Sequence, residues 1–147
     1  MKIRKAVKSD RDEWVRLRQG LWSEMHSNHF NETTRYFLKH DTGITDVFVL
    51  EHPEQSLIGY IELNIRNYAE GSQATAIPYI EAWYIESPWR QKGLGKSLLI
   101  FAEQWAKEQG YSELASDSLI NNRNSIATHK ALGFNEVERI VCFIKKL

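Results

Sequence analysis

Apolar positions recur along the chain with two different periods, and the change of period separates expected helices from expected strands. Trp14, Leu17 and Leu21 are spaced as on one face of a helix, and Ser9 with Asp12 resembles a capping box at its start. A second, shorter helix is expected over residues 33–40. Runs rich in β-branched and aromatic residues predict strands at residues 2–7, 46–51, 57–66, 78–85, 111–116 and 137–143.

Two further helices are expected in the second half of the chain. One begins near Leu94, carries an apolar face and ends before Gly110, and the other covers residues 122–132. The resulting order is strand, two helices, two strands, a polar loop, and then strand, helix, strand, helix, strand. This order predicts an α/β layered fold with a mixed sheet, and the length of 147 residues predicts a single domain over residues 1–147.

Composition and charge narrow the class of protein. Hydrophobic residues make up 42% and charged residues 26%, which is typical of a globular chain, and 19 basic side chains balance 19 acidic ones. Zero net charge gives no overall attraction to nucleic acid or to membrane, so we predict neither as a partner. A single cysteine, Cys142, fits a reducing compartment and excludes a multi-cysteine zinc site. We therefore predict a cytoplasmic protein with no membrane span and no bound metal.

The stretch SPWRQKGLG, residues 87–95, stands between an expected strand and an expected helix. Gly93 and Gly95 allow the backbone to approach a ligand closely, and the helix beginning near Leu94 offers unpaired amides and the positive end of its dipole. Three cationic side chains surround this point: Arg90, Lys92 and Lys96. The combination suits a diphosphate, and the alternative is a glycine-rich turn with solvated cations. The P-loop and dinucleotide-binding spacings are both absent.

Two spaced motifs accompany this order of elements. They are Arg90-x-x-Gly93-x-Gly95 after a strand, and Asn122-x-x-Ser125-x-x-x-His129-x-x-x-Gly133-Phe134 further along. Together they resemble the GCN5-related N-acetyltransferase (GNAT) family of acetyl-CoA-dependent acyltransferases. The resemblance implies a central, mixed but mostly antiparallel sheet in which two parallel strands splay apart, with helices on both faces.

The same resemblance implies acetyl-CoA as co-substrate and assigns its contacts. Its pyrophosphate would lie on the glycine loop and its pantetheine arm along the preceding strand. The implied cofactor-binding residues are Trp83, Tyr84, Ile85, Gln91, Lys92, Gly93, Leu94, Gly95, Lys96 and Asn122. Many family members have a tyrosine, proposed to protonate the leaving thiolate, where this chain has His129. A histidine can do this, and a helix histidine packed beside Leu132 is the alternative.

Two carboxylates bear on the identity of the acceptor. Glu81 is expected on the same side of its strand as Trp83 and Ile85, where an unpaired carboxylate would be costly. Asp117 follows the strand at 111–116, at the edge of the sheet where α/β folds usually bind ligands. Two carboxylates at neighbouring strand positions would make an anionic pocket, which suits a polyamine.

Five segments resemble the small dimeric aminoglycoside 6'-N-acetyltransferases more closely than the family at large: residues 16–22, 65–71, 80–95, 113–118 and 129–140. That resemblance implies Glu81 as the base toward the 6'-amine, through a water, and Asp117 as the second catalytic carboxylate, which binds substrate ammonium groups. The implied substrate-binding residues are Trp22, His26, Tyr68, Glu81, Asp117 and Glu138. It also implies a homodimer in which the loop 67–76 contacts the partner.

Other interpretations stay open at this point. Glu81 could instead pair with Arg66 or Arg90, and Asp117 could simply cap the following helix. The acceptor could be a polyamine or a protein or peptide amine, and a chain without the usual tyrosine could be a non-catalytic acyl-CoA-binding module. Cys142 lies in an expected strand and is predicted to be a buried thiol, not a nucleophile.

Overall fold

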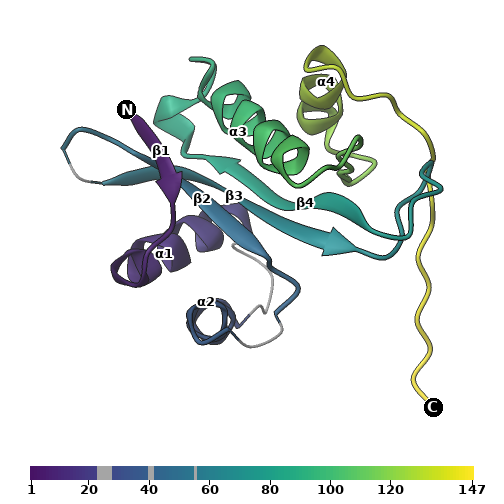
Figure 1. The fold of residues 1–147 in the computed structure, drawn as a ribbon, viewed down its shortest axis with the longest axis horizontal. Helices are drawn as coiled ribbons and strands as arrows, with labels where there is room; N and C mark the ends of the chain where they lie inside the picture. The colour runs from purple at the N-terminus through teal and green to yellow at the C-terminus, as the bar shows by residue number, and fades with distance from the viewer. Residues whose placement is uncertain (23–27, 40–41, 55) are drawn as a thin grey trace.

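The computed structural model describes residues 1–22, 28–39, 42–54 and 56–147. Four antiparallel strands form one sheet in the order β1-β2-β3-β4 (Figure 1). The strands are β1 (Lys2–Lys5), β2 (Asp46–Glu51), β3 (Leu57–Arg66) and β4 (Ile77–Ile85). Two short 3-10 turns, η1 (Lys8–Asp10) and η2 (Ser87–Trp89), precede the helices α1 and α3.

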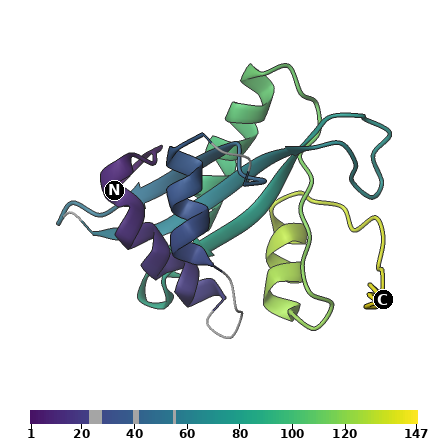
Figure 2. The ribbon, with the colours of Figure 1, turned by 90° about the horizontal axis from the view of Figure 1, so that it is seen from below.

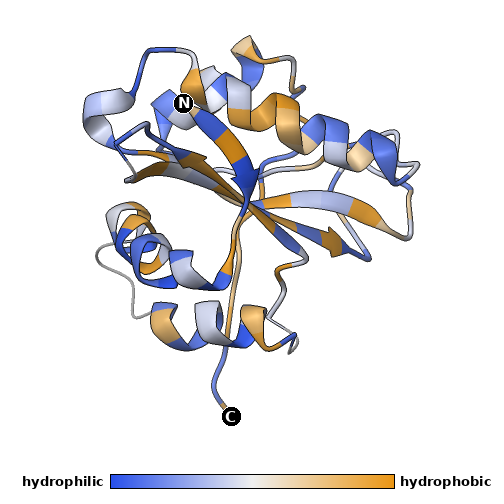
Figure 3. Cartoon of the chain, turned by 60° about the vertical axis from the view of Figure 1, so that its left-hand side comes forward, coloured by the Kyte–Doolittle hydropathy of each residue, from blue (hydrophilic) through white to orange (hydrophobic). Residues whose placement is uncertain are grey.

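Helices cover both faces of this sheet, as the fold prediction requires (Figures 1 and 2). The helices are α1 (Arg11–Leu21), α2 (His29–Phe37), α3 (Leu94–Glu108) and α4 (Arg123–Ala131). Trp14 and Leu17 of α1 pack with Tyr60 on one face, while Leu98 and Leu99 of α3 pack on the other. Each buried side chain of this kind contributes about 1.5–3 kcal/mol to folding. Figure 3 shows apolar positions along α3 and along the strands beneath it.

A one-residue bulge interrupts the pairing of β3 with β4. Glu62 lies opposite Ala82 and Leu63 lies opposite Ile80, so Glu81 has no partner of its own across the ladder. An extra residue of this kind shifts the alternation of side chains along its strand. Glu81 therefore shares the α1 face with Ala82, while Ile80 and Trp83 belong to the core beneath α3. The prediction that Glu81 lies on the same side as Trp83 is wrong for this reason.

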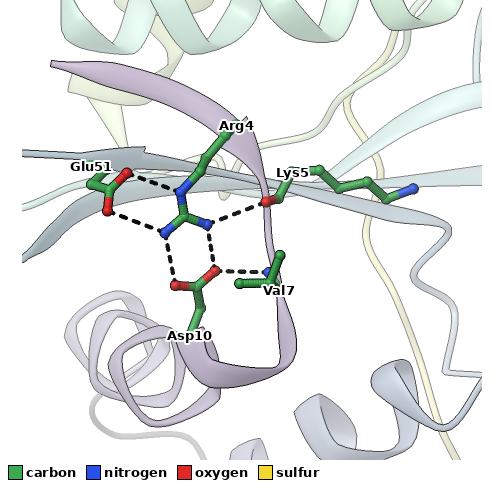
Figure 4. Close-up of polar contacts among 5 residues, drawn as sticks. All are labelled: Arg4, Lys5, Val7, Asp10 and Glu51. Carbon is green, nitrogen blue, oxygen red and sulfur yellow. Dashed lines mark hydrogen bonds and ion pairs between the residues drawn. The ribbon is translucent and has the colours of Figure 1, made fainter.

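The residue before α1 is Asp10 and not the predicted Ser9, and its side chain makes no cap hydrogen bond to the helix. The N-cap residue is Asp10, so the capping box predicted from Ser9 is wrong. Arg4 donates to Asp10 Oδ2 at 2.7 Å and Oδ1 at 3.0 Å, and its Nε donates to Glu51 at 3.0 Å (Figure 4). The Val7 amide donates to the same Asp10 carboxylate at 2.8 Å. This cluster ties the first strand, the first helix and β2 together.

Two of the predicted strands do not form. The segment 111–116 makes a single parallel bridge, in which the Ile80 amide donates to Ala115 O and the Ala115 amide donates to Pro78 O, both at 2.9 Å. After Ala115 no further bridge joins the two segments among the described residues, so the mixed character of the sheet rests on this one contact and the two chain segments diverge.

The predicted strand at 137–143 is wrong because this segment pairs with no strand of the described chain. It passes the loop 67–76 and then leaves the body of the molecule (Figure 1). Its apolar side chains lie in solvent, with Phe143 92% exposed. Cys142 is exposed as well, so the prediction of a buried thiol is also wrong. In the part of the chain that the structure describes, no helix has the length and apolar character needed to cross a membrane.

Candidate active site

The glycine loop leads from β4 into α3 through two left-handed residues. Gln91 has φ +61° and Gly93 has φ +77°, and Gly93 is the N-cap residue of α3. Arg90 steadies the loop, because its Nε donates to the Ile85 carbonyl at 2.7 Å. No side chain caps α3, and a Cβ at Gly93 would meet nothing within 4 Å. The start of this 15-residue helix therefore has no side-chain cap, and unpaired amides at a helix start suit an anion such as a pyrophosphate.

Trp83 joins this loop to α4. Its indole Nε1 donates to the Gly95 carbonyl at 3.1 Å, and its ring meets the ring of His129 edge-on at 5.5 Å. Both ring nitrogens of His129 are engaged: Nδ1 lies 2.7 Å from the Ser125 carbonyl and Nε2 lies 2.8 Å from the Ser116 hydroxyl. Because a carbonyl only accepts, Nδ1 donates to the Ser125 carbonyl. His129 of α4 is thus held in place between Trp83 and Ser116.

A cavity of about 400 Å³ lies on the opposite face of the sheet, beside α1. Its lining combines three carboxylates and two guanidinium groups with an indole; the residues are Arg18, Trp22, Glu32, Thr42, Gly43, Ile44, Glu62, Asn64, Arg66 and Glu81. Arg66 donates two hydrogen bonds to the Glu81 carboxylate, from Nε to Oε1 at 2.7 Å and from Nη2 to Oε2 at 2.6 Å. The Asn64 side chain donates a third to Oε1 at 3.2 Å. Of the alternatives for Glu81, pairing with Arg66 is the one that the structure contains.

Asp117 belongs to the same chain of contacts as Glu81. The Tyr79 hydroxyl donates to Asp117 Oδ2 at 2.7 Å, and the Arg66 guanidinium lies 3.6 Å from the centre of the Tyr79 ring. Burial and the neighbouring Asp117 carboxylate together raise the pKa of Tyr79. Arg66 and Tyr79 thus bridge the two carboxylates. The cap of α4 is the side chain of Asn122, which accepts from the Ser125 amide at 3.1 Å, so Asp117 is not that cap.

Comparison with known proteins places this geometry in a family. The model of the Acetyltransferase (GNAT) family matches residues 12–134. The chain belongs to the GNAT acetyltransferases. The acetyltransferase is 32% identical over 142 residues to an aminoglycoside N(6')-acetyltransferase type 1 of Stenotrophomonas maltophilia, covering 96% of this chain and 90% of the relative. It is 35% identical over 136 residues to a protein of the same name from Acinetobacter genomosp. 13, covering 92% and 91%.

Solved structures agree over the whole chain. The crystal structure of the aminoglycoside 6'-N-acetyltransferase AAC(6')-Ig from Acinetobacter haemolyticus superposes with a TM-score of 0.87 at 30% identity, covering 100% of this acetyltransferase and 99% of that chain. AAC(6')-Iy in complex with the bisubstrate analogue CoA-S-monomethyl-acetylneamine gives a TM-score of 0.88 at 28% identity, covering 99% and 98%. The predicted GNAT fold is confirmed.

The acetyltransferase brings together some of the predicted substrate residues and separates others. Trp22 and Glu81 line the cavity, and Asp117 joins it through Tyr79. Tyr68 is 62% exposed in the loop 67–76, and Glu138 is exposed in the C-terminal segment; neither lines the cavity. These two share one edge of the molecule, because Val137 lies against Gly71 of that loop. The remaining prediction, His26, lies outside the described residues.

Two charged residues that line the cavity, Arg18 and Glu62, were not predicted from the sequence of this acetyltransferase. Glu62 is 1% exposed, and Trp14 Nε1 donates to its Oε1 at 2.9 Å. Burial raises the pKa of Glu62 to about 7, although the Arg18 guanidinium opposes the shift. Two features of the sequence could have revealed this pair: Arg18 falls four residues after Trp14 on an apolar helix face, and Glu62 stands within the apolar run LIGYIEL.

Proposed function

We propose that this protein transfers the acetyl group of acetyl-CoA to the 6'-amine of aminoglycoside antibiotics, which inactivates the drug. The observation that carries the proposal is that β4 presents Glu81 to the charged cavity on the α1 face, through its bulge, and leads at its end into the uncapped start of α3. The names of the relatives and the bisubstrate analogue bound to AAC(6')-Iy support the same acceptor. We infer direct transfer in a ternary complex.

Acetyl-CoA would supply an activated thioester carbonyl. The pyrophosphate would be held by the amides at the start of α3, in the loop formed by Gln91, Lys92, Gly93, Leu94, Gly95 and Lys96. The backbone of Trp83, Tyr84 and Ile85 would bind the pantetheine arm, because beyond the bridge at Ala115 this edge of β4 pairs with no described segment. A backbone amide near Trp83 would stabilise the oxyanion that develops during transfer, and Asn122 would add a further contact.

On the other side of the strand, the carboxylates would prepare the acceptor. A protonated amine is not a nucleophile, so Glu81 would take its proton through a water. Asp117 would bind other ammonium groups of the drug, and Trp22 with Tyr68 would lie against its sugar rings. Glu138 would add negative charge at the entrance. Arg66 holds the Glu81 carboxylate from two sides and would fix its direction during this step.

The finer properties of the protein belong to the same proposal. We infer a cytoplasmic homodimer built from a single N-acetyltransferase domain, residues 1–147. The exposed apolar side chains of residues 137–147 support a partner surface, because a second copy could bury them. Tyr68 and Glu138 lie at that edge and would complete the acceptor site from the partner side. Deleting residues 135–147 is expected to give a monomer with lowered turnover in sedimentation and rate measurements.

Thiol release tests the reaction directly. Purified protein is incubated with acetyl-CoA and tobramycin, kanamycin, spermidine or an amino-terminal peptide, and free CoA is followed. We expect turnover on both drugs, a loss of at least about 100-fold in Glu81→Gln, the typical contribution of a general base, and no change in the exposed control Glu54→Gln. Turnover on spermidine or peptide but on neither drug would show that the acceptor is not an aminoglycoside. Acetyl-CoA binding without turnover on any amine would favour a non-catalytic acyl-CoA-binding module.

A further inference from the structure

Glu62 is a buried carboxylate on the wall of the acceptor cavity, and the transfer reaction as derived above does not use it. It sits in the middle of β3, one residue away from the bulge that carries Glu81. Trp14 Nε1 donates to its Oε1 at 2.9 Å, and Arg18 Nε lies 3.2 Å from the same oxygen. A carboxylate this deeply buried is costly unless its charge is matched.

The charge of Glu62 is only partly matched. Arg18 is itself 4% exposed and is shared, since its Nη2 lies 2.5 Å from Glu32 Oε2. One guanidinium therefore serves two carboxylates. Among the described residues, Arg18 Nε, Arg18 Nη1 and the Tyr60 hydroxyl have no hydrogen-bond partner, so the contact between Arg18 Nε and Glu62 is an ion pair without a hydrogen bond. The neighbouring pair of Arg66 with Glu81 is balanced in itself.

Counting the cavity's ionised groups shows what this arrangement does. Among the lining residues that the structure describes, two arginines face three glutamates, so these five groups carry one negative charge in excess when all are ionised and none when Glu62 is protonated. Burial raises the pKa of Glu62 to about 7, and the Glu32 and Glu81 carboxylates raise it further against the opposing effect of Arg18. The net charge of these described groups thus depends on Glu62 near neutral pH. His29, which stacks on Trp22, is a second titratable group beside Arg18 and Glu32, and burial lowers its pKa below the ordinary value.

We propose that Glu62 is the variable charge of the acceptor cavity, and that entry of a cationic acceptor drives its proton into solvent. The inference rests on the proposed function, because it needs an acceptor that carries ammonium groups. The proton balance is simple: the Glu62 carboxylic acid and a free ammonium ligand give a Glu62 carboxylate, a bound ammonium ligand and one released proton. Glu62 does not touch the reacting atoms. Its negative charge favours cationic acceptors in the cavity, so it is a positioning and specificity residue.

The sign of the pH dependence follows from linkage. A nearby cation favours the ionised form, so the pKa of Glu62 is lower in the complex than in the free protein. The contribution of Glu62 to acceptor affinity therefore rises as pH increases through the pKa of Glu62 and is constant above it. If the cation lowers this pKa by about one unit, affinity changes by about tenfold between pH 5.5 and pH 8.

Glu62→Gln is the test, because glutamine keeps an oxygen for Trp14 and loses the charge. Titration calorimetry with tobramycin, in buffers of different ionisation enthalpy from pH 5.5 to 8, gives both affinity and protons released. We expect the variant to match the wild type at pH 5.5, to bind about tenfold more weakly at pH 8, and to release fewer protons near pH 7. The drug's own amines contribute equally to both proteins. Acetyl-CoA affinity should not change, and Glu103→Gln on α3 is the matched control.

The possible outcomes distinguish a failure of the role proposed for Glu62 from a failure of the proposed aminoglycoside acetylation. Equal affinity and equal proton release in Glu62→Gln and wild type, with tobramycin still acetylated, overturn the role of Glu62 alone. A wild type that neither binds nor acetylates tobramycin overturns both. If Glu62→Gln does not fold, carboxyl carbon NMR of the wild type decides the matter: the Glu62 resonance must titrate near neutral pH and shift to lower pH with tobramycin, and a resonance unmoved by the drug refutes the inference.

Discussion

Exchanging each glycine of the cofactor loop for alanine tests whether the loop's backbone, and not merely its small size, is what binds the donor. Gly93 is left-handed, with φ +77° and ψ 1°, whereas Gly95 lies inside α3. At Gly93 a Cβ would meet nothing within 4 Å, so alanine brings only the backbone cost, about 1–2 kcal/mol. At Gly95 a Cβ would meet Trp83 at 3.7 Å, an ordinary contact, and alanine gains up to about 1 kcal/mol as a better helix former.

The two variants should therefore differ by about 2 kcal/mol in unfolding free energy, in opposite directions from the wild type. Gly93→Ala need not lower the unfolding free energy, because the loop of the free protein can relax to a conformation that alanine adopts without strain. Acetyl-CoA would then have to restore the strained form, and the same 1–2 kcal/mol would raise the dissociation constant by about 5- to 30-fold. The cost must appear in folding, in binding, or divided between them.

Denaturant unfolding and calorimetry with acetyl-CoA measure the two quantities on the same samples. Gly95→Ala serves as the control and should keep acetyl-CoA affinity within about twofold, in accordance with the glycine or alanine that the motif allows. A Gly93→Ala variant with unchanged stability and unchanged affinity would refute the reasoning. Selective loss of acetyl-CoA binding in Gly95→Ala would do the same.

Two further predictions concern the charged cluster beneath β1 and the cap of α4. Burial raises the pKa of Asp10, but the hydrogen bonds from Arg4 and the Val7 amide outweigh it and hold that pKa below the usual value. The ionised Asp10 therefore stabilises the fold above about pH 4, and this stabilisation is lost as pH falls through the lowered pKa. Arg4→Met should lower the unfolding free energy by about 2 kcal/mol at pH 7, and denaturant curves should show the difference shrinking below pH 4. Asn122→Ala removes the cap hydrogen bond and should cost about 1 kcal/mol, with Asn122→Ser close to wild type; equal melting of all three proteins would contradict the cap.

The features predicted well from sequence are those that short segments determine. The glycine loop and the start of α3 near Leu94 lie within a few residues of one another, so local spacing was enough to predict them. The apolar faces of α1 and α3 were likewise readable from helical periodicity. The motif pointed to the right family because it joins a strand end to a helix start.

The orientation of Glu81 was beyond sequence reasoning because it depends on pairing. Alternation along β4 alone puts Glu81 with Trp83, and only the register against β3 reveals the extra residue. Its partner was equally undetermined, since Arg66 and Arg90 were both near in sequence. Arg18 and Glu62 escaped notice because 44 residues separate them and each looks ordinary beside its own neighbours.

The strand predicted at 137–143 failed for a different reason. Its composition favours an extended chain, and the backbone there does run away from the body of the molecule (Figure 1). A strand also needs a neighbour to complete its hydrogen bonds, and composition does not say where that neighbour is. Propensity was thus a guide to conformation but not to pairing.

The extra residue in β4 also bears on the timing of catalysis. The proposed donor seat opens beside α3, and the cavity for the acceptor opens beside α1, on the reverse of the same strand. On the proposed function, neither ligand would have to pass through the site of the other, so drug and thioester would be able to bind in either order. They would meet beyond Ala115, where β4 pairs with no described segment.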